Sequence, residues 1–177
     1  MREKYYLDND WYFSEKWEAA QSNAEYDEAA MQSVRIPHTV KELPFHYFDE
    51  HAYQMVSGYR RHLLVKKEWE GKVVRLTFEG VAHDSEVFVN GKKAGAHHCG
   101  YTAFTIDISA LLYYGEDNII AVRVDSNENL NVPPFGFVID YMTYGGVYRD
   151  VYLEINEESY LADVFLKPHL IPSKRAI

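Results

Sequence analysis

The chain has 177 residues, of which 47% are hydrophobic and 25% are charged, a balance that fits one globular domain and argues against disorder. Its 18 basic and 27 acidic side chains give a formal net charge of −9, which disfavours binding to nucleic-acid phosphates or to an anionic membrane surface. The one cysteine, Cys99, cannot form an internal disulfide.

The first residues mix charged and aromatic side chains, with no apolar run of signal-peptide length. No stretch approaches the ~18 consecutive apolar residues that cross a bilayer, so we expect a cytoplasmic protein without a membrane partner. Residues 25–32 are rich in alanine, with Asp27 and Glu28 at their start, and predict a short helix or turn. The basic pair Arg60-Arg61 precedes alternating apolar residues and indicates a strand edge.

Hydrophobic residues alternate with period two from residue 73 onward, which predicts strands with one buried face. Asn90-Gly91 follows one such run and supplies the positive φ angles of a two-residue hairpin turn. Short strands separated by turn clusters predict an all-β antiparallel sandwich. The alternating runs are 73–78, 86–89, 104–108, 120–124 and 147–153.

Two segments interrupt this pattern. Residues 132–144 contain Pro133-Pro134 and Gly136 among several aromatics, and we expect an ordered loop that carries Asp140. Residues 156–159 are polar, and the apolar run 161–166 that follows predicts a strand with no later partner in this sequence. We therefore divide the chain into a domain of residues 1–158 and the start of a second, truncated domain at 159–177.

Seven short motifs occur in a fixed order along the chain. They are Trp11, Ile36-Pro37-His38, Gly58-Tyr59-Arg60, Phe78-Glu79-Gly80-Val81, Val89-Asn90-Gly91, Gly100-Tyr101 with Phe104, and Gly145 to Val151. In these motifs and their order the chain resembles, from about residue 10 to residue 154, the sugar-binding domain that opens glycoside hydrolases of family 2, the β-galactosidase and β-glucuronidase family.

The resemblance implies a jelly-roll sandwich of the galactose-binding-domain type, followed in a complete enzyme by an immunoglobulin-like domain and a (β/α)₈ barrel. Residues 159–177 would then begin the immunoglobulin-like domain. The complete enzyme would be a retaining O-glycosyl hydrolase, most similar to a β-galactosidase, whose catalytic barrel this chain lacks.

We expect no catalytic residue in this chain, because a retaining glycosidase needs two carboxyl groups about 5–5.5 Å apart. Two Asn-Glu dipeptides match the form of the family's acid/base, but both fall in polar turns after strands. They are Asn127-Glu128 and Asn156-Glu157.

Three residues are predicted to contact a substrate: Asp140 and Gln54 from the resemblance, and Tyr141 as an aromatic next to Asp140. Asp140 stands where the galactosidases have an Asp that reaches the sugar in the cleaved position, and a carboxylate can accept hydrogen bonds from two adjacent hydroxyls. The alternative is a solvated Asp140 that caps a turn beside Tyr141. Gln54 is a weaker match to a second sugar contact, because the galactosidases have Asn-Pro where this chain has Gln54-Met55.

Other polar groups have structural interpretations. Arg149 shares a strand face with Val147 and Val151, so we expect a buried guanidinium paired with a carboxylate. His97-His98-Cys99, with His83 nearby in the sequence, contains zinc-ligand types. Adjacent strand residues point to opposite faces, so we expect no metal site, and no nucleotide or cofactor motif occurs.

Three functions remain open from the sequence. The first is the sugar-binding domain of a β-glycosidase, whose partners are a β-galactoside or related glycoside and the barrel of the same polypeptide. The second is an independent carbohydrate-binding module that uses exposed aromatics such as Tyr141, Tyr144 or Phe135. The third is a structural domain that packs on the barrel and mediates subunit contacts in a homo-oligomer.

Overall fold

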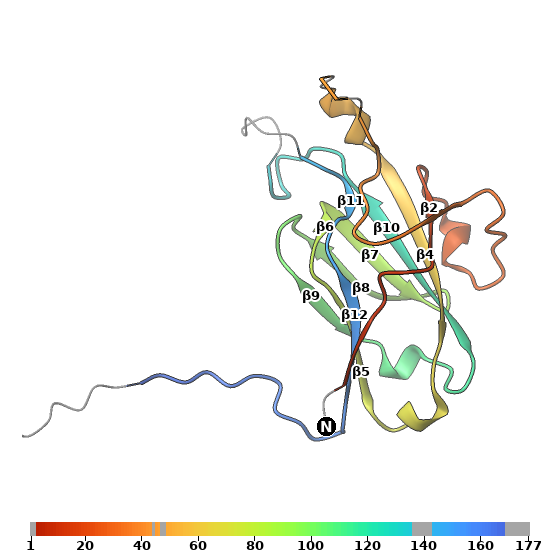
Figure 1. Ribbon diagram of the computed structural model, residues 1–177, viewed down its shortest axis with the longest axis vertical. Helices are drawn as coiled ribbons and strands as arrows, with labels where there is room; N and C mark the ends of the chain where they lie inside the picture. Colours follow the sequence, from red (N-terminus) through yellow and green to blue (C-terminus); the bar gives the residue numbers. More distant parts are fainter. Residues whose placement is uncertain (1–2, 44, 47–48, 136–142, 169–177) are drawn as a thin grey trace, which may run out of the picture.

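A computed structural model describes residues 3–43, 45–46, 49–135 and 143–168 (Figure 1). Within these residues every strand pairing is antiparallel, and two larger sheets pack on one another around a shared core. The predicted all-β jelly-roll sandwich is confirmed. No helix in the described part of the chain is long and apolar enough to cross a membrane.

The strands of the smaller of these sheets are, in spatial order, β1 (Glu3–Tyr6), β12 (Val151–Asn156), β5 (Val73–Phe78) and β9 (Phe104–Asp107). The larger sheet has the order β3 (Gln32–Val34), β2 (Trp11–Ser14), β4 (Val56–Leu64), β10 (Asp117–Asp125), β7 (Asp84–Val89) and β8 (Lys92–His98). A short pair joins β11 (Gly146–Val147) to β6 (Val81–Ala82). Short 3₁₀ helices are η1 (Ala19–Ser22), η2 (Glu50–Tyr53), η3 (Lys67–Trp69) and η4 (Ser109–Leu111).

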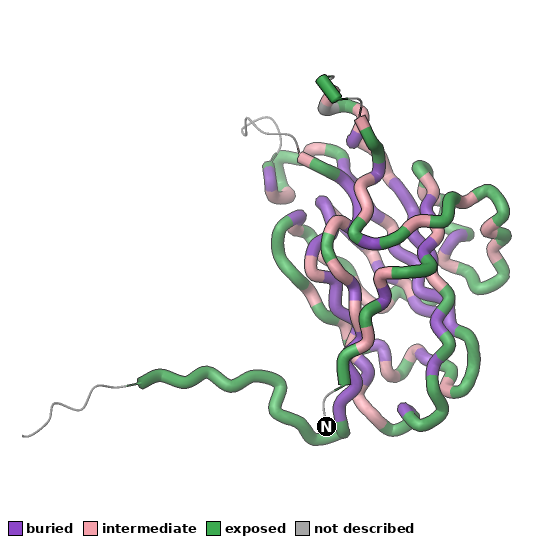
Figure 2. The backbone as a smooth tube through the Cα atoms, viewed as in Figure 1, coloured by how far each residue is buried: buried purple, intermediate pink, exposed green. Residues whose placement is uncertain are grey.

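The core lies between the two larger sheets, as the purple segments of Figure 2 show. Alternate residues of β5 and β10 supply it, because successive side chains of a strand point to opposite faces. Burying each large aliphatic or aromatic side chain contributes roughly 1.5–3 kcal/mol. Fully buried members from these strands are Val74, Leu76, Phe78, Ile120, Val122 and Val124.

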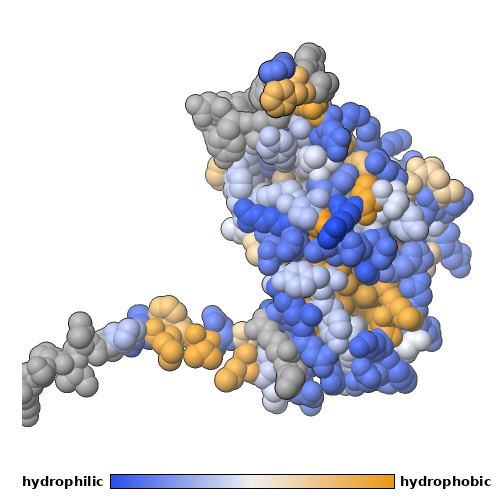
Figure 3. Space-filling model, viewed as in Figure 1, coloured by the Kyte–Doolittle hydropathy of each residue, from blue (hydrophilic) through white to orange (hydrophobic). Residues whose placement is uncertain are grey.

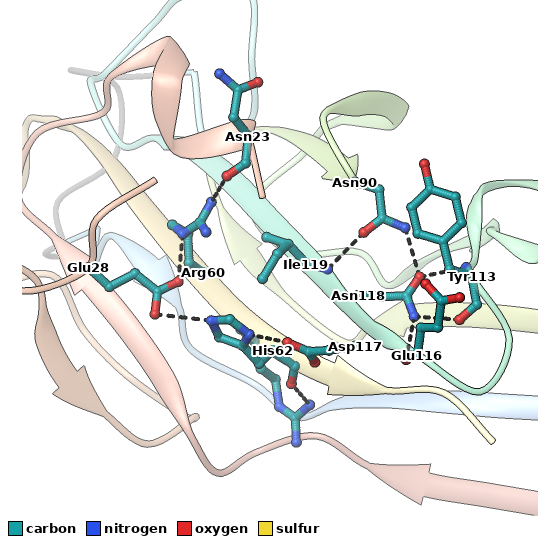
Figure 4. A network of polar contacts seen from close by, with 11 residues as sticks. Asn23, Glu28, Arg60, His62, Asn90, Tyr113, Glu116, Asp117, Asn118 and Ile119 are labelled. Atoms are coloured by element: carbon teal, nitrogen blue, oxygen red, sulfur yellow. Dashed lines mark hydrogen bonds and ion pairs between the residues drawn. The ribbon is translucent and has the colours of Figure 1, made fainter. Parts of the chain in front are cut away.

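The Asn90-Gly91 hairpin forms between β7 and β8 as predicted, with φ of 50° and 78° at the two residues. The Asn90 side chain also ties this turn to the neighbouring strand (Figure 4). Its Nδ2 donates to Asn118 Oδ1 at 2.7 Å, and its Oδ1 accepts from the Ile119 backbone N–H at 2.9 Å. The turn is therefore fixed at both its backbone and its side chain.

Arg60 lies in the interior of the larger sheet, since β4 pairs with both β2 and β10. The predicted strand edge at Arg60-Arg61 is therefore wrong. The buried Arg60 guanidinium donates from Nε to Glu28 Oε1 at 2.8 Å (Figure 4). Glu28 comes from the segment 25–32, which forms turns, and the short helix η1 precedes that segment.

The alternating run 147–153 is divided in the structure. β11 ends at Val147 and β12 begins at Val151, with no strand between them. Residues 157–168 form no helix or strand and extend away from the sandwich (Figure 1). The strand expected at 161–166 does not form here, because a strand needs a hydrogen-bonded neighbour. The apolar side chains of this tail are exposed and appear orange in Figure 3.

Candidate functional site

One end of the sandwich brings together the segments that the sequence singled out. Here β4 begins, β10 ends and β11 pairs with β6 (Figure 1). The rings of Tyr53 and Tyr144 meet edge to face, with centroids 5.3 Å apart. Ser126 Oγ donates to the Met55 carbonyl at 3.0 Å, and a Cβ on Gly145 would lie 2.6 Å from that hydroxyl. The loops before β4, after β10 and before β11 are therefore packed on one another.

Gln54 lies at this end of the sandwich, directly after η2. Its backbone N–H donates to the His51 carbonyl at 3.1 Å, which closes the last turn of the 3₁₀ helix. Its side-chain Nε2 is buried and has no hydrogen-bond partner among the described residues. A buried donor without an acceptor is costly, which makes Gln54 Nε2 an unusual group at this end of the sandwich.

Asp140 and Tyr141, the other two predicted substrate contacts, lie outside the described residues. The described residues on either side of them in the sequence are Phe135 and Thr143. Phe135 and Tyr144, two of the aromatics predicted to face a glycan, are exposed. No contact of Asp140 is therefore part of the observed geometry, and its role stays a prediction.

A concave site of about 260 Å³ adjoins Tyr144, and we call it the His83 hollow. Three tyrosines form its aromatic wall, and His83 and Arg149 supply its cationic or polar nitrogens. Its lining residues are Ala82, His83, Gly100, Tyr101, Thr143, Tyr144, Tyr148 and Arg149.

His83 is the unusual group in this hollow. Its side chain is 4% exposed, yet neither Nδ1 nor Nε2 has a hydrogen-bond partner in the described part of the chain. Its backbone N–H donates to the Asp125 carbonyl at 3.0 Å, which holds it beside the end of β10. Burial lowers the pKa of His83, and the nearby Asp125 charge only partly opposes this. The imidazole is therefore neutral near pH 7, with one donor and one acceptor nitrogen.

Arg149 and Tyr148 also line the hollow. Arg149 is exposed, and its Nη1 donates to the Tyr101 carbonyl at 3.2 Å. Tyr148 Oη donates to the Gly100 carbonyl, and the Arg149 guanidinium carbon lies 5.2 Å from the centre of the Tyr148 ring. The expected burial of Arg149 is wrong, because the strand breaks at Tyr148 and so no longer turns residue 149 toward the core.

The imidazoles considered as metal ligands have other neighbours. His97 Nε2 lies 2.8 Å from Thr102 Oγ1, and His98 Nδ1 lies 2.7 Å from Asp84 Oδ1. Among the described residues, no group of three or more His, Cys, Asp and Glu side chains is arranged to hold a metal ion.

The sequence drew attention to His83 only as an outlying member of that histidine group. A better signal was its position, since a polar ring directly follows the fully apolar pair Val81-Ala82. In the folded chain His83 lines the hollow together with Gly100 and Tyr101. Gly100 is 17 residues away in the sequence, so the sequence alone does not indicate this proximity.

Comparison with known proteins gives matches over nearly the whole described sandwich. Residues 5–156 match the family model described as the sugar-binding domain of glycosyl hydrolases family 2. A β-galactosidase from Thermoanaerobacter pseudethanolicus is 44% identical over 142 residues, which cover 80% of this chain and 19% of the relative. A β-galactosidase from Thermoanaerobacterium thermosulfurigenes is 37% identical over 170 residues, which cover 96% of this chain and 24% of that relative.

The solved structures agree in fold. A crystal structure of Bacteroides uniformis β-glucuronidase superposes with a TM-score of 0.76 at 27% identity, over 88% of this chain and 18% of that one. The chain thus spans about a fifth to a quarter of the length of the curated relatives and about a fifth of that structure.

Proposed function

The chain belongs to the sugar-binding domains of glycosyl hydrolases family 2, and from this we propose that it helps to form the substrate site of a β-galactosidase-type glycosidase. In this proposal the bond is broken by groups on further polypeptide. The domain contributes Asp140, with Gln54 and Tyr141 beside it, to a bound β-galactoside or related glycoside. The two relatives named above are β-galactosidases, which favours a galactoside.

The observation that carries this proposal is the fixed position of the chain just after Asp140. Tyr144 packs on Tyr53, and the Val40 backbone N–H donates to the Gly145 carbonyl at 3.1 Å. Asp140 is three residues before Thr143 in the sequence. A tether of three residues spans at most about 11 Å, so a sugar contact of Asp140 would have to lie at this end of the sandwich.

A carboxylate at this position suits a sugar. Two adjacent ring hydroxyls can each donate to one of its oxygens, and hydrogen bonds to a charged group contribute about 1.5–3 kcal/mol each. The unsatisfied Gln54 Nε2 supplies a further donor on the same end of the domain. Together these groups would orient a glycoside and leave bond cleavage to the barrel.

The exposed tail supports the placement of this domain within a longer polypeptide. Leu161, Phe165 and Leu166 are each at least 80% exposed, which is unusual for apolar side chains that follow one another so closely. We infer that residues 159–177 begin the next domain and that the polypeptide beyond them covers these side chains.

The test is a kinetic comparison in the complete enzyme. Asp140→Ala should lower kcat/KM by about 10- to 100-fold, the loss expected from one charge-assisted hydrogen bond, and by more if both hydroxyls bind the carboxylate. Asp140→Asn keeps an acceptor and should fall between this variant and the wild type. Glu68→Ala, which removes an exposed carboxylate on η3 at the other end of the sandwich, is the control. Wild-type kcat/KM in a folded Asp140→Ala enzyme would refute the assignment.

A further inference from the structure

We propose that the His83 hollow is a binding site for one pyranose unit, in which the His83 imidazole exchanges hydrogen bonds with a ring hydroxyl. The choice of a carbohydrate as ligand rests on the proposed function. The site itself rests on His83, Gly100 and Arg149, which the sequence did not assign to a substrate, and on Tyr144, which the sequence assigned to a glycan only in the binding-module alternative.

The first argument is the state of His83. A side chain that is 4% exposed, with both ring nitrogens unpartnered among the described residues, carries the desolvation cost of two polar atoms without compensation. Both nitrogens belong to a residue that lines the hollow. A ligand that supplies one acceptor and one donor would recover this cost.

The second argument is the close packing of Gly100 on the imidazole. A Cβ on Gly100 would lie 3.0 Å from His83 Nδ1, so a side chain at this position would press on the ring. The Gly100 backbone is held in place by the hydrogen bond from Tyr148 Oη. A fixed glycine therefore holds the buried imidazole at the lining of the hollow.

The third argument concerns the class of ligand. A neutral imidazole offers one donor and one acceptor, and a hydroxyl has the same two capacities, whereas a carboxylate or phosphate only accepts. The exposed Tyr144 ring can stack on the apolar face of a sugar, and the Arg149 guanidinium adds donors at the rim. A volume of about 260 Å³ is below the ~300–1,000 Å³ of sites for drug-sized ligands, which favours a single pyranose ring.

The experiment is an NMR titration of the 177-residue chain with methyl β-D-galactopyranoside. We expect saturable shifts of the His83 ring and Arg149 side-chain resonances, with a dissociation constant on the order of millimolar. Sodium acetate serves as the anionic comparison and should give no saturable shift. Saturable binding of acetate without binding of the glycoside would overturn the proposal, as would the absence of any saturable shift at His83.

Two variants separate binding from folding. His83→Phe keeps a planar ring and removes both nitrogens, so it should weaken glycoside binding at least about tenfold. Because those nitrogens are unpartnered, the same variant should unfold at an equal or higher temperature than the wild type. A clear loss of stability would mean that the imidazole makes a structural contact, and would contradict the proposal.

The second variant keeps the proposal testable if His83→Phe does not fold. Tyr144→Ala removes a ring that is 54% exposed at the hollow and should weaken the same binding. Tyr113→Ala removes a ring that is 53% exposed near η4, at the other end of the sandwich, and should leave binding unchanged. Equal effects of the two variants would count against the hollow. If Asp140→Ala lowers kcat/KM as expected but the glycoside gives no saturable shift at His83, the His83 hollow is rejected as a sugar site while the proposed function stands.

Discussion

Removing Glu28 should destabilise this domain far more than removing an exposed carboxylate with the same ion-pair distance. Arg60 Nε lies 2.8 Å from Glu28 Oε1, and the two side chains are 0% and 13% exposed. Lys41 Nζ lies 2.8 Å from Glu15 Oε1, but those side chains are 45% and 58% exposed. The two pairs therefore differ mainly in burial.

The size of the stability loss in Glu28→Ala depends on the hydrogen bonds that Arg60 retains. Without Glu28 its charge stays buried, and it still donates to the carbonyls of Gln21 and Asn23. Breaking a buried pair by removing one partner costs about 3–5 kcal/mol, and these carbonyls place Glu28→Ala near the lower value, about 3 kcal/mol. Domains of 150–250 residues lose about 2–4 °C in Tm per kcal/mol, so we expect a decrease of about 6–12 °C. Glu15→Ala should cost at most ~1 kcal/mol.

The assay is thermal unfolding of the wild type and of both variants at one pH, with urea unfolding to obtain free energies. His62 also approaches Glu28, with Nε2 3.3 Å from Oε2, so His62→Ala measures that smaller part separately. Similar Tm values for Glu28→Ala and Glu15→Ala would refute the reasoning. So would a loss in His62→Ala as large as the loss in Glu28→Ala.

Two further predictions concern stability. Gly146→Ala should lower the free energy of unfolding by more than ~3 kcal/mol, because φ is +106° and the new Cβ would lie 2.5 Å from Tyr59 Oη. The control is Gly71→Ala, which should cost only ~1–2 kcal/mol, because φ is +83° but no atom lies within 4 Å of the new Cβ. Equal costs of the two variants in urea unfolding would contradict the packing argument. Burial lowers the pKa of both His83 and His38, so the unfolded chain binds protons more readily, and stability should be full above pH ~6.5 and decrease as the pH falls through that value. His83→Phe should make this decrease smaller in urea titrations at pH 5 and 7.5, and an unchanged pH dependence would exclude His83 as a cause.

The strands with regular alternation could be predicted because their register is a local property. β5, β7 and β10 each place every second residue in the core, and the dipeptide Asn90-Gly91 by itself predicts the hairpin turn. The run 147–153 shows the limit of this approach. Its alternation continues through residues 148–150, but the structure leaves the strand there.

Buried charge could not be predicted from the local pattern. The charge of Arg60 on this interior strand is compensated by Glu28, 32 residues earlier, and by the carbonyls of Gln21 and Asn23. Nothing near Arg60 in the sequence identifies that partner. The same argument applies to the candidate site, where His83 meets Gly100 only in the folded sandwich. The motifs that carry the family resemblance predicted the domain, whereas the hollow required the folded geometry.

The central claim is that this end of the sandwich presents Asp140 to a sugar held by the rest of the polypeptide. The most direct test is a crystal structure of the complete enzyme with a bound β-galactoside. The account predicts both Asp140 carboxylate oxygens at about 2.5–2.8 Å from two adjacent sugar hydroxyls. A sugar bound in the barrel with the Asp140 carboxylate turned away and paired to a cation of this domain would contradict it.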